Sequence, residues 1–110
     1  MLCNNLSSIT IPASVERIGD YAFQKCGNLK NVTIEHGVDY IGQYSFSICR
    51  SLTSISIPGS LYGIGEYAFW KNENLKTVKI EDGVKKISKN VFEDCNKLKK
   101  IILPDGLKMD

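Results

Sequence analysis

The amino-acid sequence repeats with a period of 23 residues, and this period constrains the fold more than any other feature of the chain. A leucine opens each successive copy, with no insertion or deletion between copies, at Leu6, Leu29, Leu52, Leu75 and Leu98. Repeats of this length are typical of solenoids, in which each copy forms one coil that packs on its neighbours. We therefore expect one repeat domain over residues 1–110. It comprises the tail of a preceding repeat at 1–5, full repeats at 6–28, 29–51, 52–74 and 75–97, and a partial repeat at 98–110.

Near the start of each copy, apolar and polar side chains alternate. A period of two predicts a short, half-buried β-strand, and the β-branched residues found there suit a pleated surface. The alternating segments are Ile9-Thr10-Ile11, Val32-Thr33-Ile34, Ile55-Ser56-Ile57 and Val78-Lys79-Ile80. Because the copies stack in one direction, the strands should pair in parallel. Proline follows the strand in alternate copies, at Pro12, Pro58 and Pro104, and should end it because proline has no N–H to donate.

The rest of each copy supplies columns of apolar side chains that should fill the space behind the strands. The columns are Val15, Val38, Leu61 and Val84; Ile18, Ile41, Ile64 and Ile87; and Phe23, Phe46, Phe69 and Phe92. Glycine follows the isoleucine column at Gly19, Gly42 and Gly65, with Ser88 in the last full copy, and we expect a tight bend or a close approach between coils there. The next segment of each copy is too short for a stable α-helix, so short extended or 3₁₀ pieces are expected on the back.

Together these features give the pattern L-x-x-I-x-I-P-x-x-V-x-x-I-G-x-x-A-F-x-x-C, seen from Leu6 to Cys26 and nearly intact from Leu52 to Phe69. The pattern closely resembles the BspA-like (Treponema pallidum type) leucine-rich repeat over essentially the whole chain. This resemblance implies a leucine-rich-repeat solenoid, mostly β with little helix. The stack would be right-handed and curved, with a parallel sheet on its concave face and short 3₁₀ or extended segments on its convex side.

The resemblance also suggests a role, because proteins of this type are commonly secreted or attached to cell surfaces and several act as adhesins. We therefore expect a non-catalytic, adhesin-like protein-interaction module, an excerpt of a longer secreted or cell-surface leucine-rich repeat protein. Its partner would be a protein, such as a host or extracellular-matrix protein. A structural spacer or scaffold repeat with no ligand of its own is the alternative.

The candidate interaction surface consists of the outward strand positions and two aromatic residues. The strand positions are Ser8, Thr10, Asn31, Thr33, Ser54, Ser56, Thr77 and Lys79, and the aromatic residues are Tyr67 and Trp70. Small polar groups can hydrogen-bond a partner, but a solvated sheet face needs the same composition. An exposed tryptophan is a common interface anchor, although Trp70 could equally cover the edge of its coil.

Neither catalysis nor a cofactor is indicated by the residues. His36 is the only histidine and has no partner motif nearby, so we expect no enzyme. Cys3, Cys26, Cys49 and Cys95 occupy one repeat position. One thiolate per coil along a line cannot surround a zinc ion tetrahedrally, so no metal site is expected and the cysteines should form a ladder of buried free thiols.

The overall charge is too balanced to indicate nucleic acid or an anionic membrane as a partner. Lys and Arg number 14 against 12 Asp and Glu, which gives a net charge of +2. The lysine-rich stretch from residue 75 onward is interpreted as a solvated end of the chain. No apolar stretch approaches the length of a membrane span, so no membrane insertion is expected. Glycan is a less favoured ligand than protein, because few aromatic residues lie on the strand face.

Open solenoid ends expose apolar residues and unpaired strand edges. We predict self-association of this chain through Leu2 at one end or through Ile101, Ile102 and Leu103 at the other. Light scattering should show an average mass that rises with concentration, and a strict monomer over a wide concentration range would contradict the prediction.

Overall fold

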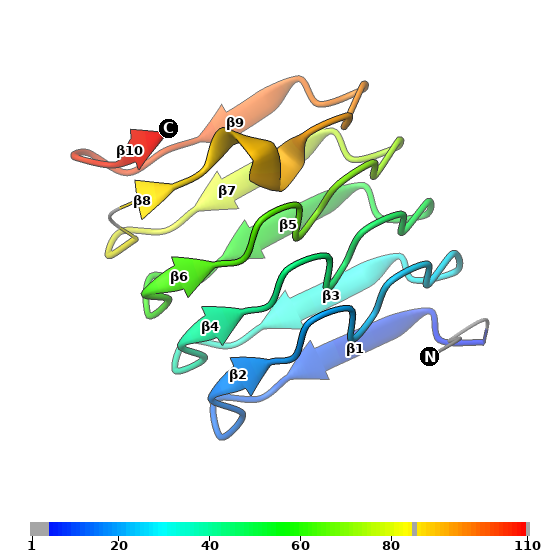
Figure 1. Ribbon diagram of the computed structural model, residues 1–110, viewed down its shortest axis with the longest axis horizontal. Coiled ribbons are helices and arrows are strands. Elements are labelled where there is room, and N and C mark those ends of the chain that lie inside the picture. Colours follow the sequence, from blue (N-terminus) through cyan, green and yellow to red (C-terminus); the bar gives the residue numbers. More distant parts are fainter. Residues whose placement is uncertain (1–4, 85, 110) are drawn as a thin grey trace.

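The computed structural model describes residues 5–84 and 86–109 and shows a solenoid in which each repeat forms one coil (Figure 1). Each coil begins with a longer strand: β1 (Ser8–Ile11), β3 (Asn31–Ile34), β5 (Ser54–Ile57), β7 (Thr77–Ile80) and β9 (Lys100–Ile102). A two-residue strand follows in each coil: β2 (Arg17–Ile18), β4 (Tyr40–Ile41), β6 (Gly63–Ile64), β8 (Lys86–Ile87) and β10 (Lys108–Met109). The 3₁₀ turn η1 (Lys89–Phe92) is the single helical element of the described residues. The expected mostly β solenoid is confirmed.

The longer strands pair in parallel with a register of one whole repeat. Ser8 lies opposite Asn31 and Ile11 opposite Ile34, and the same offset relates β5 to β7 and β7 to β9. Every residue of these strands therefore lies beside its equivalent in the next coil. A repeat position in the sequence becomes a column in space, which is why the chemistry of each face can be followed through the stack.

The ladder of longer strands is divided into two sheets between β3 and β5, although these two strands lie side by side (Figure 1). The Glu35 N–H donates to the Ile11 carbonyl at 3.0 Å, and the Glu81 N–H donates to the Ile57 carbonyl at 3.0 Å. Pro58 stands at the same repeat position in the coil between those of Glu35 and Glu81, and it has no N–H to donate. The missing donor coincides with the division between β3 and β5, but proline alone does not cause such a break, because Pro104 follows β9 and β9 still pairs with β7.

A second parallel ladder runs along the back of the coils, formed by β2, β4 and β6, with Ile18 opposite Ile41 and Ile41 opposite Ile64. The sequence predicted the isoleucine column here but not these strands, because the extended or 3₁₀ pieces were expected after the glycines; of those, the described residues contain the 3₁₀ turn η1. The ladder is interrupted between β6 and β8 and resumes in the next coil, where β8 pairs with β10.

The glycine column explains where the second ladder runs and where it is interrupted. A Cβ on Gly42 would lie 2.6 Å from the backbone nitrogen of Asp20 in the preceding coil, and a Cβ on Gly65 would collide in the same way with Gln43. The expected close approach between coils is therefore confirmed at both positions. Ser88 brings a Cβ to this place in the following coil, and there the ladder is interrupted and η1 begins.

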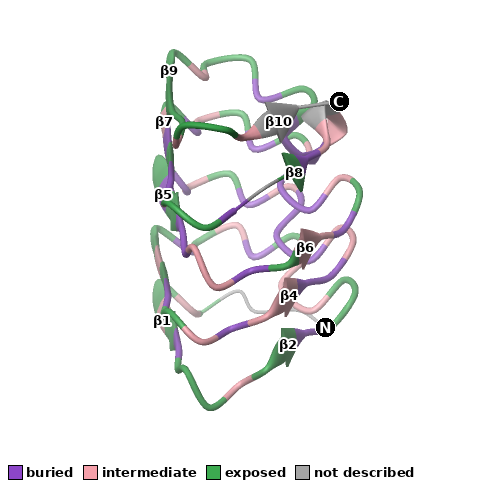
Figure 2. Ribbon diagram, turned by 90° about the vertical axis from the view of Figure 1, so that its left-hand side faces the viewer, coloured by how far each residue is buried: buried purple, intermediate pink, exposed green. Residues whose placement is uncertain are grey.

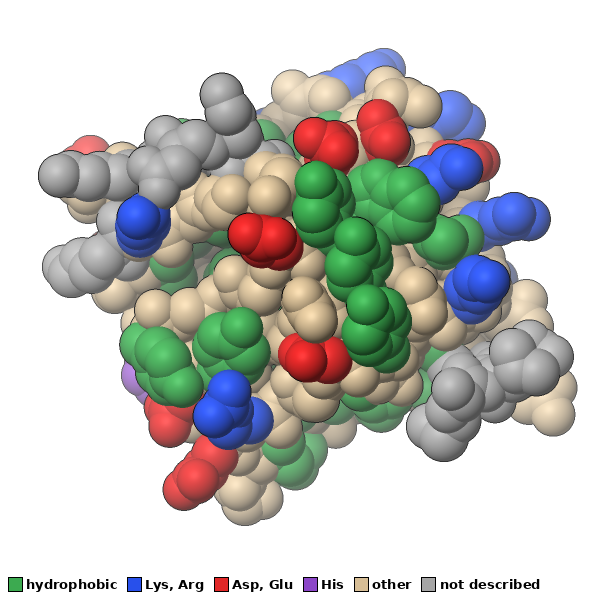
Figure 3. Space-filling view, in the orientation of Figure 1, with side chains coloured by type: hydrophobic (Ala, Val, Ile, Leu, Met, Phe, Trp, Pro, Cys, Tyr) green, Lys and Arg blue, Asp and Glu red, His purple; other side chains and the backbone are tan. Residues whose placement is uncertain are grey.

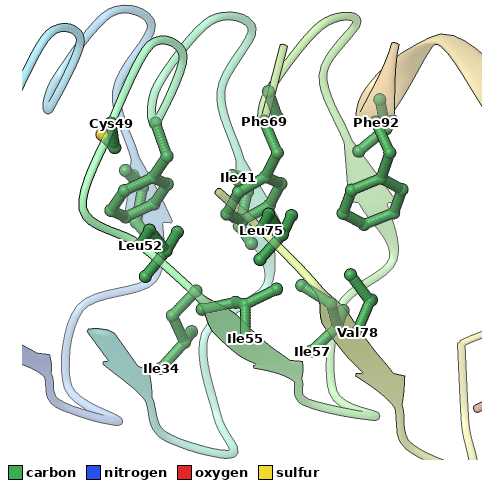
Figure 4. Packing of buried hydrophobic residues seen from close by; sticks show 14 of the residues in the cluster. Ile34, Ile41, Cys49, Leu52, Ile55, Ile57, Phe69, Leu75, Val78 and Phe92 are labelled. Atoms are coloured by element: carbon green, nitrogen blue, oxygen red, sulfur yellow. The ribbon is translucent and has the colours of Figure 1, made fainter. Parts of the chain in front are cut away.

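The core is a column of layers between the two ladders. The rings of Phe23, Phe46, Phe69 and Phe92 stack in order, with centroids 5.1, 5.4 and 5.5 Å apart. Figure 4 shows the phenylalanine and leucine columns lining up along the stack. Figure 2 shows buried residues alternating with exposed ones along the longer strands. Burial of each phenylalanine or leucine side chain of these columns contributes about 1.5–3 kcal/mol to folding. Because the members of a column come from successive coils, the stack is held mainly by contacts between coils.

Two glycines at the same repeat position should respond in opposite ways to alanine. Gly42→Ala forces a methyl group against the backbone of Asp20 and should lower the free energy of unfolding by about 1–3 kcal/mol. Gly19→Ala meets no atom within 4 Å and should be neutral or stabilising by up to about 1 kcal/mol, because alanine reduces the freedom of the unfolded chain. Urea unfolding of both variants checks this, and equal effects would refute the close approach between coils.

Candidate functional site

The outward positions of the longer strands form one continuous polar surface, which we call the strand face. Ser8, Thr10, Asn31, Thr33, Ser54, Ser56 and Lys79 are exposed, and Thr77 is half-buried. Their cross-strand neighbours are also members of the set, as in Thr10 opposite Thr33 and Ser56 opposite Lys79. The Ser56 hydroxyl donates to the Glu81 carboxylate at 3.4 Å. The expected hydroxyl-rich face is thus present.

Tyr67 and Trp70 lie apart from the strand face, on the segment that follows β6. Tyr67 continues a column with Tyr21 and Tyr44, whose ring centroids are 5.2 and 5.3 Å apart. The planes within each pair are nearly parallel, at 1° and 17°. The predicted candidate residues therefore form two surfaces instead of one.

Backbone geometry fixes the tyrosine column. Tyr21, Tyr44 and Tyr67 have φ values of 61°, 55° and 60°, in the left-handed region that costs a side-chain-bearing residue about 1–2 kcal/mol. Hydrogen bonds between coils hold this conformation, since the Tyr21 N–H donates to the Gln43 carbonyl at 3.0 Å and the Tyr44 N–H to the Glu66 carbonyl at 3.2 Å. The rings are consequently held in place before any partner arrives.

Trp70 packs across two of these tyrosines. Its ring is edge-on to Tyr44, with centroids 6.0 Å apart, and to Tyr67 at 6.5 Å. The indole N–H donates to the Asp94 carboxylate at 3.1 Å, and the Lys71 ammonium lies 5.6 Å from the ring centroid. Trp70 is half-buried, so it covers the coil edge and still reaches solvent.

We call Tyr21, Tyr44, Tyr67 and Trp70 the aromatic ridge. Figure 3 shows a contiguous row of hydrophobic side chains on the face of the molecule that also carries the short ladder. The Glu93 carboxylate above all, and then desolvation, raises the pKa of Tyr67 above its ordinary value of 10.0. The Tyr67 hydroxyl therefore remains protonated at neutral pH and can donate a hydrogen bond.

A second aromatic cluster was missed by sequence reasoning. The Tyr40 and Tyr62 rings stack with centroids 5.7 Å apart, and the Arg17 guanidinium carbon lies 4.7 Å from the Tyr40 centroid. Tyr62 is 71% exposed, the largest value among the exposed large hydrophobic residues described. Tyr40 and Tyr62 occupy adjacent repeat positions instead of the same one, so aligning the copies column by column does not bring them together.

The cysteine column departs from the expected thiol ladder. Cys26 is in a disulfide bond, so the prediction of a free thiol is wrong at that position; Cys3 lies outside the described residues. Cys49 and Cys95 are free and buried, and their thiols donate to the carbonyls of Phe23 at 3.3 Å and Phe69 at 3.2 Å.

In the remaining coil, Asn72 takes the place of cysteine in this column. Its side chain is fully buried, and its carbonyl oxygen accepts the Cys49 N–H at 2.7 Å. The substitution therefore links two coils through a side chain, where the cysteines of the column link coils through their thiols.

Three further expectations concern isolated residues. His36 is exposed, and the described part of the chain brings no group of three or more His, Cys, Asp and Glu side chains together as metal ligands.

Ile101, Ile102 and Leu103 are exposed, as the self-association prediction requires, whereas Leu2 lies outside the described residues. Among the residues described, no helix has the length and apolarity needed to cross a bilayer.

Comparison with known proteins places the repeat in a family. The family described as the BspA type leucine-rich repeat region matches residues 1–109 in six copies. No curated protein matches the chain.

Solved structures of bacterial leucine-rich repeat proteins resemble the chain over most of its length. A Treponema pallidum leucine-rich repeat protein has a TM-score of 0.67 at 26% identity, and one from Eubacterium ventriosum has a TM-score of 0.76 at 28% identity. A leucine-rich cell surface protein from Faecalibacterium prausnitzii has a TM-score of 0.63 at 28% identity. These matches cover 94%, 93% and 87% of this chain, but only 60%, 34% and 31% of the respective structures.

The two free thiols should be unreactive while the protein is folded. Burial raises the pKa of Cys49 from 9.0 to about 11 and raises that of Cys95, so neither is a thiolate at neutral pH. We expect a thiol reagent to label them only after unfolding in urea, with the sites located by mass spectrometry. Rapid labelling of the folded protein would contradict this.

The same shift predicts how stability depends on pH. Between about pH 9 and pH 11 the unfolded chain loses the Cys49 proton while the folded chain keeps it, so the free energy of unfolding should fall as the pH rises through this window. Urea unfolding at a series of pH values measures the fall. A Cys49→Ala variant is the control and should show less of it.

Proposed function

This chain belongs to the BspA-type leucine-rich repeat family, and from that premise we propose that it is a non-catalytic, adhesin-like protein-interaction module of a secreted or cell-surface protein. The observation that carries the proposal is the aromatic ridge. Tyrosine and tryptophan are enriched at the energetic centres of protein interfaces, because they bury a large area and lose little conformational entropy. A ridge already fixed by stacking would bind with a small ordering cost.

The ridge combines apolar area with polar groups at its margin. Tyr21 is 47% exposed, and the hydroxyl groups of the column together with the carboxylates of Glu66 and Glu93 could hydrogen-bond a partner. An apolar centre with a polar rim is the usual anatomy of a protein interface. We infer that an extracellular protein is the partner and that Trp70 is its anchor.

A non-catalytic role is supported by the state of the groups that could act as nucleophile or base. Burial raises the pKa values of both free thiols, which disfavours thiolate chemistry. His36 is exposed, and its imidazole makes no hydrogen bond with another described residue. A catalytic histidine is normally oriented by a second group within hydrogen-bond reach.

The proposed location, secreted or at the cell surface, is supported by the structural similarity of this chain to a cell surface protein. The Faecalibacterium prausnitzii structure, which covers 87% of this chain, is a leucine-rich cell surface protein. Each of these bacterial structures is longer than the part that this chain matches. We therefore propose that the chain acts as one segment of a longer binding surface.

The alternative is a structural spacer, and the strand face favours it. That face carries small hydroxyl groups in nearly every coil, which is what a solvated sheet surface requires. A spacer would need no anchor residue, and its repeats would serve only to hold another segment at a distance.

A binding screen of the purified chain against extracellular-matrix proteins separates the two functions. Trp70→Ala should weaken binding about 30-fold, which corresponds to about 2 kcal/mol for an interface anchor. Tyr62→Ala is the matched control, because it removes an exposed aromatic ring away from the ridge. Thr33→Glu tests the strand face in the same assay.

Equal losses for Trp70→Ala and Tyr62→Ala would remove the ridge as the binding surface. If only Thr33→Glu lost affinity, the binding surface would be the strand face instead of the aromatic ridge. If the unmodified chain bound none of the proteins, the spacer would become the better account of these repeats.

A further inference from the structure

The chain turns from its back segment into the longer strands along one edge of the solenoid, and this edge is strongly basic. We call it the basic edge; its exposed cations are Lys25, Lys30, Arg50, Lys71, Lys76, Lys97 and Lys99. Figure 3 shows Lys and Arg side chains gathered on its right-hand side, where the chain enters the longer strands in Figure 1. Glu73 and Asp94 are the acidic residues among them, and Asp94 accepts the Trp70 indole N–H.

Acidic side chains collect along the other edge, between the longer strands and the short ones. They are Glu16, Glu35, Asp39, Glu81, Asp82 and Asp105, with Arg17 and Lys86 beside them. A chain whose net charge is only +2 is thus polarised across its width. An even scatter of charge would suffice for solubility, so the separation needs another explanation.

The basic edge contains two adjoining hollows that share Arg50. One, of about 360 Å³, has Lys25, Arg50 and Lys71 in its lining together with the single carboxylate of Glu73; the other, of about 470 Å³, has Lys30, Arg50 and Lys76 and no acidic residue. The first hollow has one cation from each of three successive coils, whereas the second takes Lys30 and Arg50 from one coil and Lys76 from the coil after next. Because coils in a parallel stack lie about 4.8 Å apart, the backbone positions of Lys25 and Lys71, and those of Lys30 and Lys76, are about 10 Å apart.

The cations of the hollows are available to a ligand. The side chains of Lys25, Lys30, Arg50 and Lys76 make no hydrogen bond or ion pair with another described residue. The backbone beneath them is held between coils, since the Asn74 amide donates to the Arg50 carbonyl and the Ser51 hydroxyl to the Gly27 carbonyl, both at 2.6 Å. The site is thus a fixed trough with free cationic groups above it.

We propose that the basic edge binds a linear sulfated polysaccharide that runs along the solenoid axis. The Arg50 guanidinium can hold a sulfate through two parallel N–H donors, and the flanking lysines can neutralise the next anionic groups of the polymer. The Thr53 hydroxyl lines the second hollow and matches a sugar hydroxyl, while Ser51 and Asn74 beside it are engaged in the hydrogen bonds that fix the backbone. This site adjoins the aromatic ridge at Lys71, but the proposal does not depend on the ridge binding a partner.

The lining also discriminates against nucleic acid. Single-stranded nucleic acid is normally held by aromatic side chains on which the bases stack, and neither hollow is lined by an aromatic residue. The bulk charge, which argued against nucleic acid, does not describe this edge, because six acidic residues lie along the other edge and only Glu73 and Asp94 lie among these cations.

Binding of the intact chain to heparin at physiological salt tests the proposal. Arg50→Gln should weaken binding about tenfold, and the double variant Lys25→Gln/Lys71→Gln should weaken it further. Arg50→Lys keeps the charge but loses the paired donors, so its heparin affinity should lie between those of the unmodified chain and Arg50→Gln. Arg17→Gln is the matched control, because it removes the same charge from the other edge and should change the affinity less than twofold.

Desulfated heparin and a poly-deoxythymidine strand complete the experiment. We expect both to bind at least tenfold more weakly than heparin, and heparin affinity to fall steeply with added salt as counterions compete. The proposal is overturned if heparin does not bind at physiological salt, or if Arg17→Gln and Arg50→Gln lose equal affinity, which would indicate bulk charge alone. Stronger binding of poly-deoxythymidine than of heparin would overturn it in favour of a nucleic acid.

Discussion

The rest of the structure depends on the hydrogen-bonded register between successive coils. Each strand residue lies opposite its equivalent one repeat later, as Ser8 lies opposite Asn31 and Ser54 opposite Thr77. This register places phenylalanine on phenylalanine through the core and tyrosine on tyrosine at the surface. Because a coil contacts only its neighbours, stability is a sum of such interfaces, and a change at one position acts first on the adjacent coils.

Each of the two ladders is interrupted once, at a position where neighbouring coils carry different residues. Pro58 lacks the N–H that glutamate supplies in the coils on either side, and the sheet of longer strands divides at its coil. Ser88 carries a Cβ where Gly42 and Gly65 need none, and the short ladder is interrupted there. The stack tolerates each interruption because the apolar columns continue through it, with Phe69 still stacked on Phe92.

A solenoid of this kind presents several faces whose chemistry is set independently. The strand face is polar, the aromatic ridge is stacked and fixed in place, and the basic edge holds cations in two adjoining hollows. Lys71 joins two of these surfaces, since it lines a hollow and lies 5.6 Å from the centroid of the Trp70 ring. A polymer on the basic edge and a protein on the ridge would therefore lie next to each other, and a longer array of such repeats would extend both surfaces.

The sequence by itself determined the repeat, the parallel strands, the apolar columns and the positions of the tyrosines, because each of these follows from residues that recur at a fixed period. Only the tertiary structure decided which residues at different repeat positions contact one another. It brought Tyr40 to Tyr62, placed Trp70 across Tyr44 and Tyr67, paired the short strands, and gathered Arg50 with lysines from the coils on both sides. These contacts run diagonally between coils and depend on the path of each turn and on side-chain direction, which a column-by-column alignment of the copies does not contain.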